Sequence, residues 1–170
     1  MMFDNYNLDA AGARDEMQTP KYDFSTYSSA QLTFDVAYRQ YDNQYSDTLA
    51  VLVSTDCGQT FTQVYLKGGS TLSTVAGTYT ANTFVPSGNT QWRNESVSLN
   101  AYAGQGNVMV VFQNRGRYGQ ALYVDNINIT GTAAGAPPTA LFTSSATKCS
   151  GTAIQFTDGS TGSPTSWAWS

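Results

Sequence analysis

The sequence predicts an all-β protein built as a two-sheet antiparallel sandwich, and three observations support this fold class. Hydrophobic residues make up 41% of the 170 residues, which is enough to form a packed core. Apolar side chains recur with a period of two in several segments, whereas the period of 3.6 that marks an amphipathic helix is hard to find. Clusters of Gly, Asn, Ser and Asp separate these segments, as turns separate antiparallel strands.

Three strands are predicted in the first half of the chain, at residues 31–39, 48–54 and 61–67. The first shows the clearest alternation, because Leu32, Phe34 and Val36 share one face and Thr33 and Asp35 share the other. Such a strand buries its apolar face against a core and leaves its polar face in water.

Three further strands are predicted in the second half, at residues 96–101, 107–113 and 122–130. The middle one is a nearly continuous apolar run, which is typical of a strand buried on both faces. Residues 70–89 are rich in Thr and weakly patterned, so we expect an extended connection over the sheet there. Strands at this spacing favour a jelly-roll sandwich.

Residues 132–138 are small and end in two prolines, which indicates a linker between two domains. The sequence therefore predicts a jelly-roll sandwich over residues 1–131. Residues 139–170 are expected to form the N-terminal part of a second β-domain, with short strands near 140–143 and 153–157. This second segment is too short to close a stable core without help, so we expect a truncated domain.

Histidine is absent, which excludes every mechanism that depends on an imidazole. Ser-His-Asp and Cys-His nucleophiles, histidine-bound zinc and histidine general bases are excluded on this ground. A pair of carboxylates acting as in a glycoside hydrolase stays open as an enzymatic alternative. We expect a non-catalytic chain with no catalytic residues of its own.

The charge balance argues against a nucleic-acid partner. The net charge is −4, only eight residues are Lys or Arg, and no basic run is present to neutralise a phosphate backbone. No apolar run approaches the roughly 20 residues that span a bilayer. We therefore expect neither nucleic-acid binding nor membrane insertion.

Two aspartates are candidate metal ligands because strand parity places them with core residues. Asp47 shares its parity with Leu49, and Asp125 shares its parity with Ile127. If these apolar residues face the core, both carboxylates point inward near strand ends. An ionised carboxylate there requires a cation, an arginine or several N–H donors.

One hypothesis is a structural calcium ion bound by Asp47 and Asp125, together with Asp4 or Asn5. Carboxylate and amide oxygens are ligands that calcium prefers. The alternative is that each carboxylate is held by hydrogen bonds within a turn, and the sequence leaves both interpretations open.

Residues 115–119 place two arginines and a tyrosine on a turn beside the last strand. Together with Tyr38, Tyr41 and Tyr45 they form a candidate binding surface, because Tyr and Arg provide contact area and hydrogen bonds at low entropic cost. The alternative is an ordinary tyrosine-rich sheet edge.

Residues 54–61 match the pattern Ser-x-Asp-x-Gly-x-Thr-aromatic, which is called an Asp-box and resembles the turns of sialidase propeller blades. In such a hairpin we expect Asp56 to accept backbone N–H bonds across the turn while Gly58 adopts a positive φ. A single copy without propeller repeats predicts a structural hairpin.

A likeness to a known family is carried by residues 15–20, 30–38, 45–51, 92–99 and 123–127, and it covers residues 1–131. These segments resemble the cleaved-adhesin and MAM-like jelly rolls of secreted Bacteroidetes proteins. In detail the chain is similar to the domain that follows the catalytic domain in pappalysin-like zinc metallopeptidases. Residues 137–169 resemble the opening of an Ig-like PKD domain.

The resemblance implies a module of a secreted or outer-surface bacterial protein, with a zinc metallopeptidase as the expected parent. It implies adhesion, substrate docking or stabilisation, with an extracellular protein or glycan as partner, and structural calcium at Asp47 and Asp125. The peptidase motif His-Glu-x-x-His is absent, and so is the family's usual strand before residues 3–6. The alternative function is a carbohydrate-binding module, since jelly rolls with exposed aromatic residues commonly bind glycans.

Overall fold

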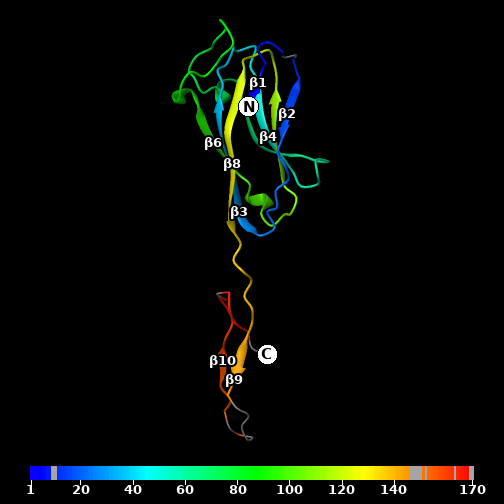
Figure 1. Cartoon of the computed structure of the whole chain (residues 1–170), viewed down its shortest axis with the longest axis vertical. Helices are drawn as coiled ribbons and strands as arrows, with labels where there is room; N and C mark the ends of the chain where they lie inside the picture. Colours follow the sequence, from blue (N-terminus) through cyan, green and yellow to red (C-terminus); the bar gives the residue numbers. More distant parts are fainter. Residues whose placement is uncertain (9–10, 146–150, 152, 163, 169–170) are drawn as a thin grey trace. The chain divides into compact units, whose positions relative to one another are not determined.

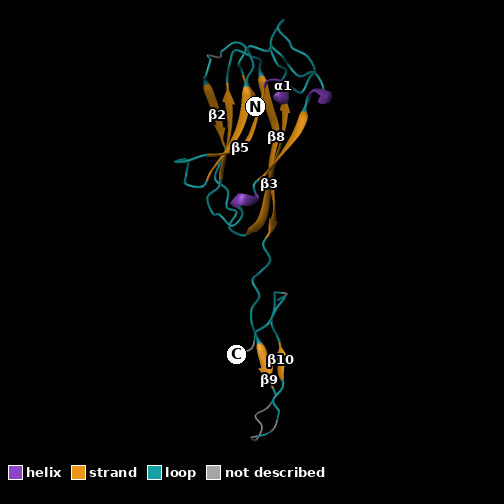
Figure 2. Cartoon of the chain, turned by 180° about the vertical axis from the view of Figure 1, so that it is seen from behind, coloured by secondary structure: helices purple, strands orange, loops and turns teal. Residues whose placement is uncertain are grey.

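The computed structural model describes residues 1–8, 11–145, 151, 153–162 and 164–168 (Figure 1). The chain divides into two compact units, Met1–Ala133 and Ala134–Ser170. Strands and loops make up almost all of both units, and the helical pieces are single turns (Figure 2). No helix in the described part of the chain is long and apolar enough to cross a membrane.

The first unit is a sandwich of two four-stranded antiparallel sheets, which confirms the predicted fold class. The first sheet has the order β1-β8-β3-β6, with β1 at Met2–Phe3, β8 at Leu122–Ala133, β3 at Tyr27–Ala37 and β6 at Arg93–Ser98. The second sheet has the order β2-β7-β4-β5, with β2 at Arg14–Gln18, β7 at Met109–Arg115, β4 at Thr48–Ser54 and β5 at Thr62–Gly68. Every connection except β4–β5 crosses from one sheet to the other.

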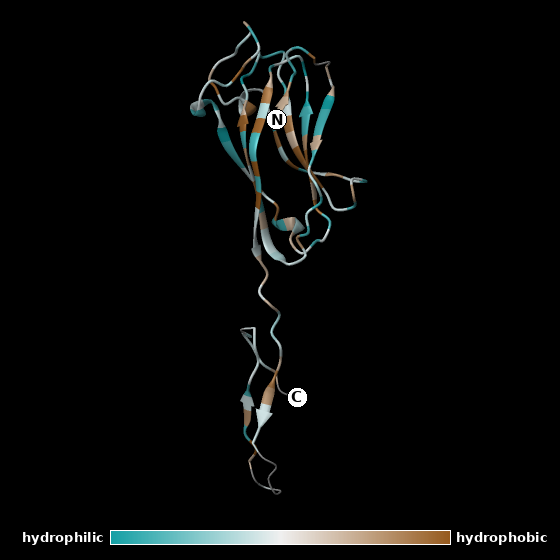
Figure 3. Cartoon of the chain, viewed as in Figure 1, coloured by the Kyte–Doolittle hydropathy of each residue, from teal (hydrophilic) through white to brown (hydrophobic). Residues whose placement is uncertain are grey.

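The core lies between the two sheets and is built by the alternation that the sequence shows. Leu32, Phe34 and Val36 of β3 are fully buried, and the Phe34 ring meets the Phe112 ring of β7 edge to face at 5.0 Å. Figure 3 shows the corresponding alternation of hydrophobic and hydrophilic residues along the strands. The central strands β4 and β7 are buried on both faces, as the apolar run in β7 predicted.

All six predicted strands of this unit are present; β4 has the expected bounds, and those of the other five differ by a few residues. The connection predicted at 70–89 contains no strand; it begins within α1 (Gly69–Leu72) and ends in the 3₁₀ turn η1 (Asn89–Gln91). A second 3₁₀ turn, η2 (Asn100–Tyr102), follows β6. Two edge strands, β1 and β2, were not predicted. The first has two residues, and the second is mostly charged and exposed.

The prediction that Asp125 points into the core is wrong, because β8 changes its parity. Leu122 and Val124 face the core, but the register with β3 shifts next to Asp125 and Asn126 adopts a φ of 49°. Ile127 then takes up the core-facing position, and Asp125 lies exposed on the outer face. An irregularity of this kind inserts one residue and reverses which residues face inward.

The β4–β5 connection is the predicted Asp-box hairpin. One carboxylate oxygen of Asp56 accepts N–H bonds from Gln59 at 3.1 Å and Thr60 at 2.9 Å, and the other accepts the Thr60 hydroxyl at 2.6 Å. Cys57 and Gly58 both have positive φ, at 64° and 87°. The bonds from the Thr60 hydroxyl and amide, with that from Ser54, lower the pKa of Asp56 to about 2.

This pKa predicts how the hairpin responds to acid. An unfolded aspartate titrates near pH ~3.9, so the stabilisation by Asp56 is fully present above that pH and is lost as the pH falls through about 2. The amide chemical shifts of Gln59 and Thr60 are expected to titrate with a midpoint near pH 2. They are expected to stay flat in an Asp56→Asn variant, and a midpoint near pH 4 in the parent chain would contradict these hydrogen bonds.

The second unit is a small antiparallel hairpin of β9 (Phe142–Ser144) and β10 (Phe156–Asp158). The Phe142 and Phe156 rings are 5.7 Å apart and remain more than half exposed. The indole N–H of Trp167 donates to Asp158 at 3.0 Å. This hairpin occupies the segment for which the sequence predicted the opening of a PKD domain, and that assignment stays a prediction.

Candidate binding surface

Four tyrosines from three connections meet at one end of the first unit. Tyr6 follows β1, Tyr41 and Tyr45 lie between β3 and β4, and Tyr118 lies between β7 and β8. Ring centroids are 6.3 Å apart for Tyr6 and Tyr41, 6.4 Å for Tyr41 and Tyr45, and 6.2 Å for Tyr45 and Tyr118. We refer to these four residues as the tyrosine cluster.

The rings of the tyrosine cluster form a faceted surface instead of a flat platform. Neighbouring ring planes meet at 49°, 71° and 88°. Tyr45 is 37% exposed and Tyr118 is 51% exposed, while the other two rings are partly covered. A ligand can therefore meet ring faces and ring edges together, in geometries that aromatic groups favour.

The buried carboxylate of Asp47 organises the loop that carries Tyr118. Its Oδ1 accepts the backbone N–H groups of Arg117 at 2.8 Å and Gly119 at 3.2 Å. Its Oδ2 accepts the N–H of Gln120 at 2.8 Å and the hydroxyl of Tyr38 at 3.1 Å. Asp47 has no exposed surface, so these four donors replace the water that its carboxylate has lost.

Burial dominates the electrostatics of this site. Desolvation raises the pKa of Asp47, although the three backbone N–H bonds and the Tyr38 hydroxyl favour the charged form. Burial and the neighbouring Asp47 charge raise the pKa of Tyr38 as well, so its phenol stays protonated and donates. The predicted inward orientation of Asp47 is confirmed, and its carboxylate accepts hydrogen bonds from N–H and O–H groups of the protein.

Buried amide side chains extend this support to the neighbouring connections. The Gln120 side chain donates to the carbonyls of Tyr79 at 2.9 Å and Asn82 at 2.8 Å, and accepts the N–H of Phe84 at 2.7 Å. Asn5 donates to the Gln120 carbonyl at 3.2 Å, which ties the segment after β1 to the same loop. Buried hydrogen bonds therefore hold the segments that carry Tyr6 and Tyr118.

Tyr41, Tyr45 and Tyr118, which the sequence placed on one surface, do lie together. Tyr38 does not join them, because it is fully buried and its hydroxyl bonds Asp47. Its parity with Val36 in the strand predicted at residues 31–39 already placed it on the core face. Tyr6 was missed, since no local pattern marks it and only the pairing of β1 with β8 brings it to this end.

The three aspartates proposed as calcium ligands have separate surroundings. Asp4 accepts the backbone and side-chain N–H groups of Asn7, and Asp125 accepts the N–H of Asn126. Among the described residues, no three Cys, Asp or Glu side chains are grouped so as to hold a metal ion. These residues therefore do not form a common ligand set, and calcium binding stays a prediction that a titration followed by thermal unfolding tests.

A polar recess of about 560 Å³ is lined by residues from the connections that carry the tyrosine cluster. Arg117 and Ser46, each next to a cluster tyrosine in the sequence, both line it. The other polar side chains that line it are Gln40, Thr48, Ser70 and Arg115. A recess of this size is large enough for a small ligand or one residue of a polymer.

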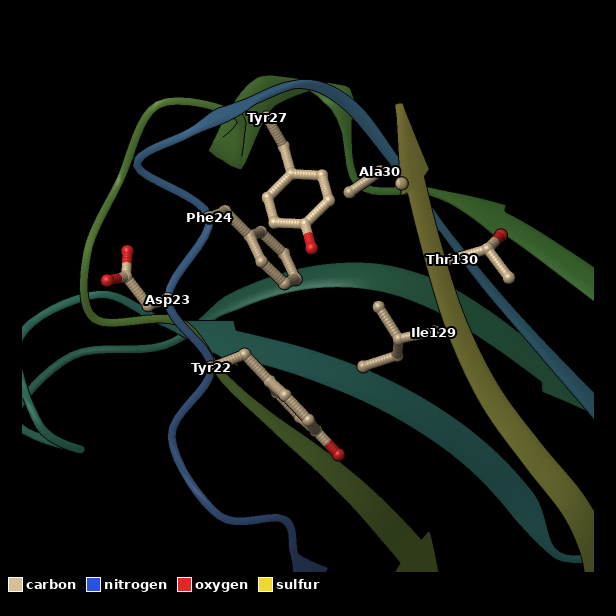
Figure 4. Close-up of a pocket in the computed structure, with 8 residues that line it drawn as sticks. Tyr22, Asp23, Phe24, Tyr27, Ala30, Ile129 and Thr130 are labelled. Atoms are coloured by element: carbon tan, nitrogen blue, oxygen red, sulfur yellow. The ribbon is translucent and has the colours of Figure 1, made fainter. Parts of the chain in front are cut away.

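A smaller pocket of about 160 Å³ lies at the opposite end of the unit, between the start of β3 and the end of β8 (Figure 4). Tyr22, Phe24, Tyr27 and Ile129 turn toward it. Its one acidic side chain, Asp23, accepts the N–H of Ser25 at 2.9 Å and points away from the rings. The described residues that line this aromatic pocket therefore include no pair of carboxylates.

No protein-family model matches the chain, and no curated protein matches it significantly. Among solved structures, the chain is similar to the K1 cleaved adhesin domain of Lys-gingipain from Porphyromonas gingivalis W83. The two are 18% identical with a TM-score of 0.50, and the match covers 78% of this chain and 73% of that one. A likeness at this identity concerns the fold, and it supports the expected cleaved-adhesin-like β-sandwich.

Proposed function

We propose that this chain is a non-catalytic binding module of a secreted or cell-surface bacterial protein, and that the tyrosine cluster is its contact surface. The observation that carries the proposal is the set of four neighbouring tyrosines on loops that a fully buried aspartate holds in place. The module adheres to, or docks its parent on, an extracellular protein or glycan. The cleaved-adhesin-like fold supports this role by analogy.

The physical basis of the proposal is preorganisation. Tyrosine offers a large, rigid, amphipathic surface with few rotatable bonds, and such residues dominate many binding surfaces. A loop that is already ordered loses little further entropy when a partner binds. Asp47 and Gln120 order the backbone beneath Tyr118, so the cluster combines rigid side chains with an ordered loop.

The parent in this proposal is a zinc metallopeptidase, with the module positioning its substrate. This part rests on the sequence resemblance alone. The calcium ion that the same resemblance implies belongs to the proposal only as an untested feature, and no step of binding depends on it.

The carboxylate-pair alternative finds little support in the recesses. The described residues that line the polar recess include no carboxylate, and the pocket in Figure 4 includes one, Asp23. Glycoside hydrolysis of the usual kind requires two carboxyl groups flanking one bond. Because neither pocket offers such a pair among its described lining residues, a binding role is favoured over hydrolysis.

Removal of the two most exposed cluster rings tests the proposal. A Tyr45→Ala/Tyr118→Ala variant is expected to bind at least about tenfold more weakly to whichever immobilised ligand retains the parent chain, because exposed aromatic anchors carry much of the binding energy. The panel comprises fibronectin, collagen, mucin and neutral and acidic polysaccharides, measured by biolayer interferometry. Because neither side chain belongs to the buried core, the thermal midpoint is expected to change little.

Tyr27→Ala is the matched control. Tyr27 has the same 37% exposure as Tyr45 but lies at the opposite end, beside the pocket in Figure 4. Its loss is expected to leave binding unchanged. Loss of binding in Tyr27→Ala with retention in the double variant would move the contact surface to that pocket, and absence of binding across the panel would refute the proposed module.

A further inference from the structure

Three arginines gather at the end of the second sheet where the tyrosine cluster lies. Arg14 of β2 pairs directly opposite Arg115 of β7, and Arg117 follows in the same loop as Tyr118. Like charges directly opposite on neighbouring strands repel each other. In a chain with eight basic residues and a net charge of −4, this is a local concentration of positive charge.

None of these three arginines forms an ion pair with a described acidic side chain. Glu95 holds Lys67 and Arg93 in ion pairs at 2.7 Å, whereas neither Arg115 nor Arg117 has a described ion-pair partner. Arg115 donates to the neutral amides of Gln113 at 2.8 Å and Gln63 at 3.0 Å, which fixes its direction without cancelling its charge. The Arg117 side chain is exposed.

The backbone below Arg117 is as ordered as that below Tyr118. The Arg117 N–H donates to Asp47 at 2.8 Å, and the neighbouring Gly116 donates to Ala13 at 3.0 Å. Gly12 donates in turn to the Gly116 carbonyl at 3.0 Å, so the segment before β2 closes against this turn. Hydrogen bonds therefore hold the backbone of Arg117 and the guanidinium of Arg115, and both residues line the polar recess.

We propose that the polar recess binds an acidic sugar, with Arg115 and Arg117 recognising its carboxylate and the tyrosine cluster contacting its ring. The guanidinium fork matches the two oxygens of a carboxylate, and such charge-assisted bonds are the strong ones. An anion here also relieves the repulsion between Arg14 and Arg115. The inference rests on the proposed binding function and names the ligand class of the same surface.

The lining favours a sugar over an acidic peptide. Beside the arginines it offers the hydroxyls of Ser46, Thr48 and Ser70 and the amide of Gln40, which suit a ligand rich in hydroxyl groups. Of the described lining residues, Ala11 alone is apolar apart from the glycines, so no pocket for an apolar peptide side chain is provided. The faceted tyrosines suit a chain end or a single residue better than a flat polymer face.

Titration calorimetry of the whole chain with three probes tests the inference: trigalacturonate, neutral maltotriose and hexaglutamate. Trigalacturonate is expected to bind at least about tenfold more tightly than either of the others. Arg117→Ala is expected to weaken trigalacturonate binding by about tenfold or more while maltotriose binding stays unchanged. Raising the salt concentration is expected to weaken the binding of trigalacturonate selectively, since Arg117 is exposed and Arg115 is only partly buried.

Lys21→Ala is the matched control, because it removes one positive charge near Cys57, beyond the far end of β4. It is expected to leave the affinity for trigalacturonate unchanged. Equal affinity for maltotriose would overturn charge recognition but keep the binding module, and equal affinity for hexaglutamate would assign an acidic peptide instead. If no probe binds while the tyrosine variants still lose binding to the immobilised panel, the sugar inference fails and the proposed function stands.

Discussion

Replacing Asp47 with alanine is expected to lower the free energy of unfolding by about 3–5 kcal/mol. The substitution leaves three backbone N–H groups and the Tyr38 hydroxyl without their acceptor, and Tyr38 and Gln120 have no exposed surface at which water could replace it. Each unsatisfied donor costs about 1–3 kcal/mol, and relaxation of the loop recovers part of the loss. Since a domain of this size has a total stability of about 5–15 kcal/mol, the effect is large.

Urea denaturation followed by tryptophan fluorescence measures this loss. Asp47→Asn is expected to cost less than Asp47→Ala, because the amide oxygen still accepts while the amide nitrogen faces donors. Asp125→Ala is the matched control, and its exposed position predicts a change within about 0.5 kcal/mol. A loss below about 1 kcal/mol in Asp47→Ala would show that the carboxylate does not organise this end of the sandwich.

Gly119→Ala is expected to destabilise the first unit by about 2–4 kcal/mol. A Cβ at Gly119 would overlap the Asp47 carboxylate, which its own hydrogen bonds hold in place. Either the loop or the carboxylate must shift, and each shift breaks bonds of the same cluster. Thermal unfolding measures the effect, with Gly88→Ala as control, since a Cβ at Gly88 meets nothing within 4 Å.

The two substitutions are expected to be less than additive when combined. Asp47→Ala removes the group that a Cβ at Gly119 would strike, so the second substitution adds little to the first. Full additivity in a double-mutant cycle would place the damage of Gly119→Ala elsewhere. The cycle thus separates a specific steric clash from a general loss of loop flexibility.

The strands were predictable because hydrophobic alternation is a local property. Leu32, Phe34 and Val36 specify the core face of β3 without reference to any other strand. The edge strand β2 was not predicted because its residues are mostly charged and its pairing with β7 depends on the tertiary structure. The outward orientation of Asp125 could not be predicted for a related reason. No sequence pattern near Asn126 indicates the register shift between β8 and β3.

The binding surface was partly predictable. Tyr41, Tyr45 and Tyr118 follow or precede strands whose ends meet at one end of the sandwich, so their proximity follows from the topology. The role of Tyr38 and the entry of Tyr6 depend on how side chains and the chain start pack in three dimensions. The polar recess and its arginines also depend on packing in three dimensions, because segments far apart in the sequence line the recess.

Native-state hydrogen exchange of the backbone amides of Arg117, Gly119 and Gln120 tests the central claim most directly, namely that Asp47 holds the binding loop in a preformed arrangement. These amides are expected to exchange as slowly as those of the buried strand β7, and to lose this protection in Asp47→Asn. Exchange at the rate of an open surface loop in the parent chain would contradict a preformed surface.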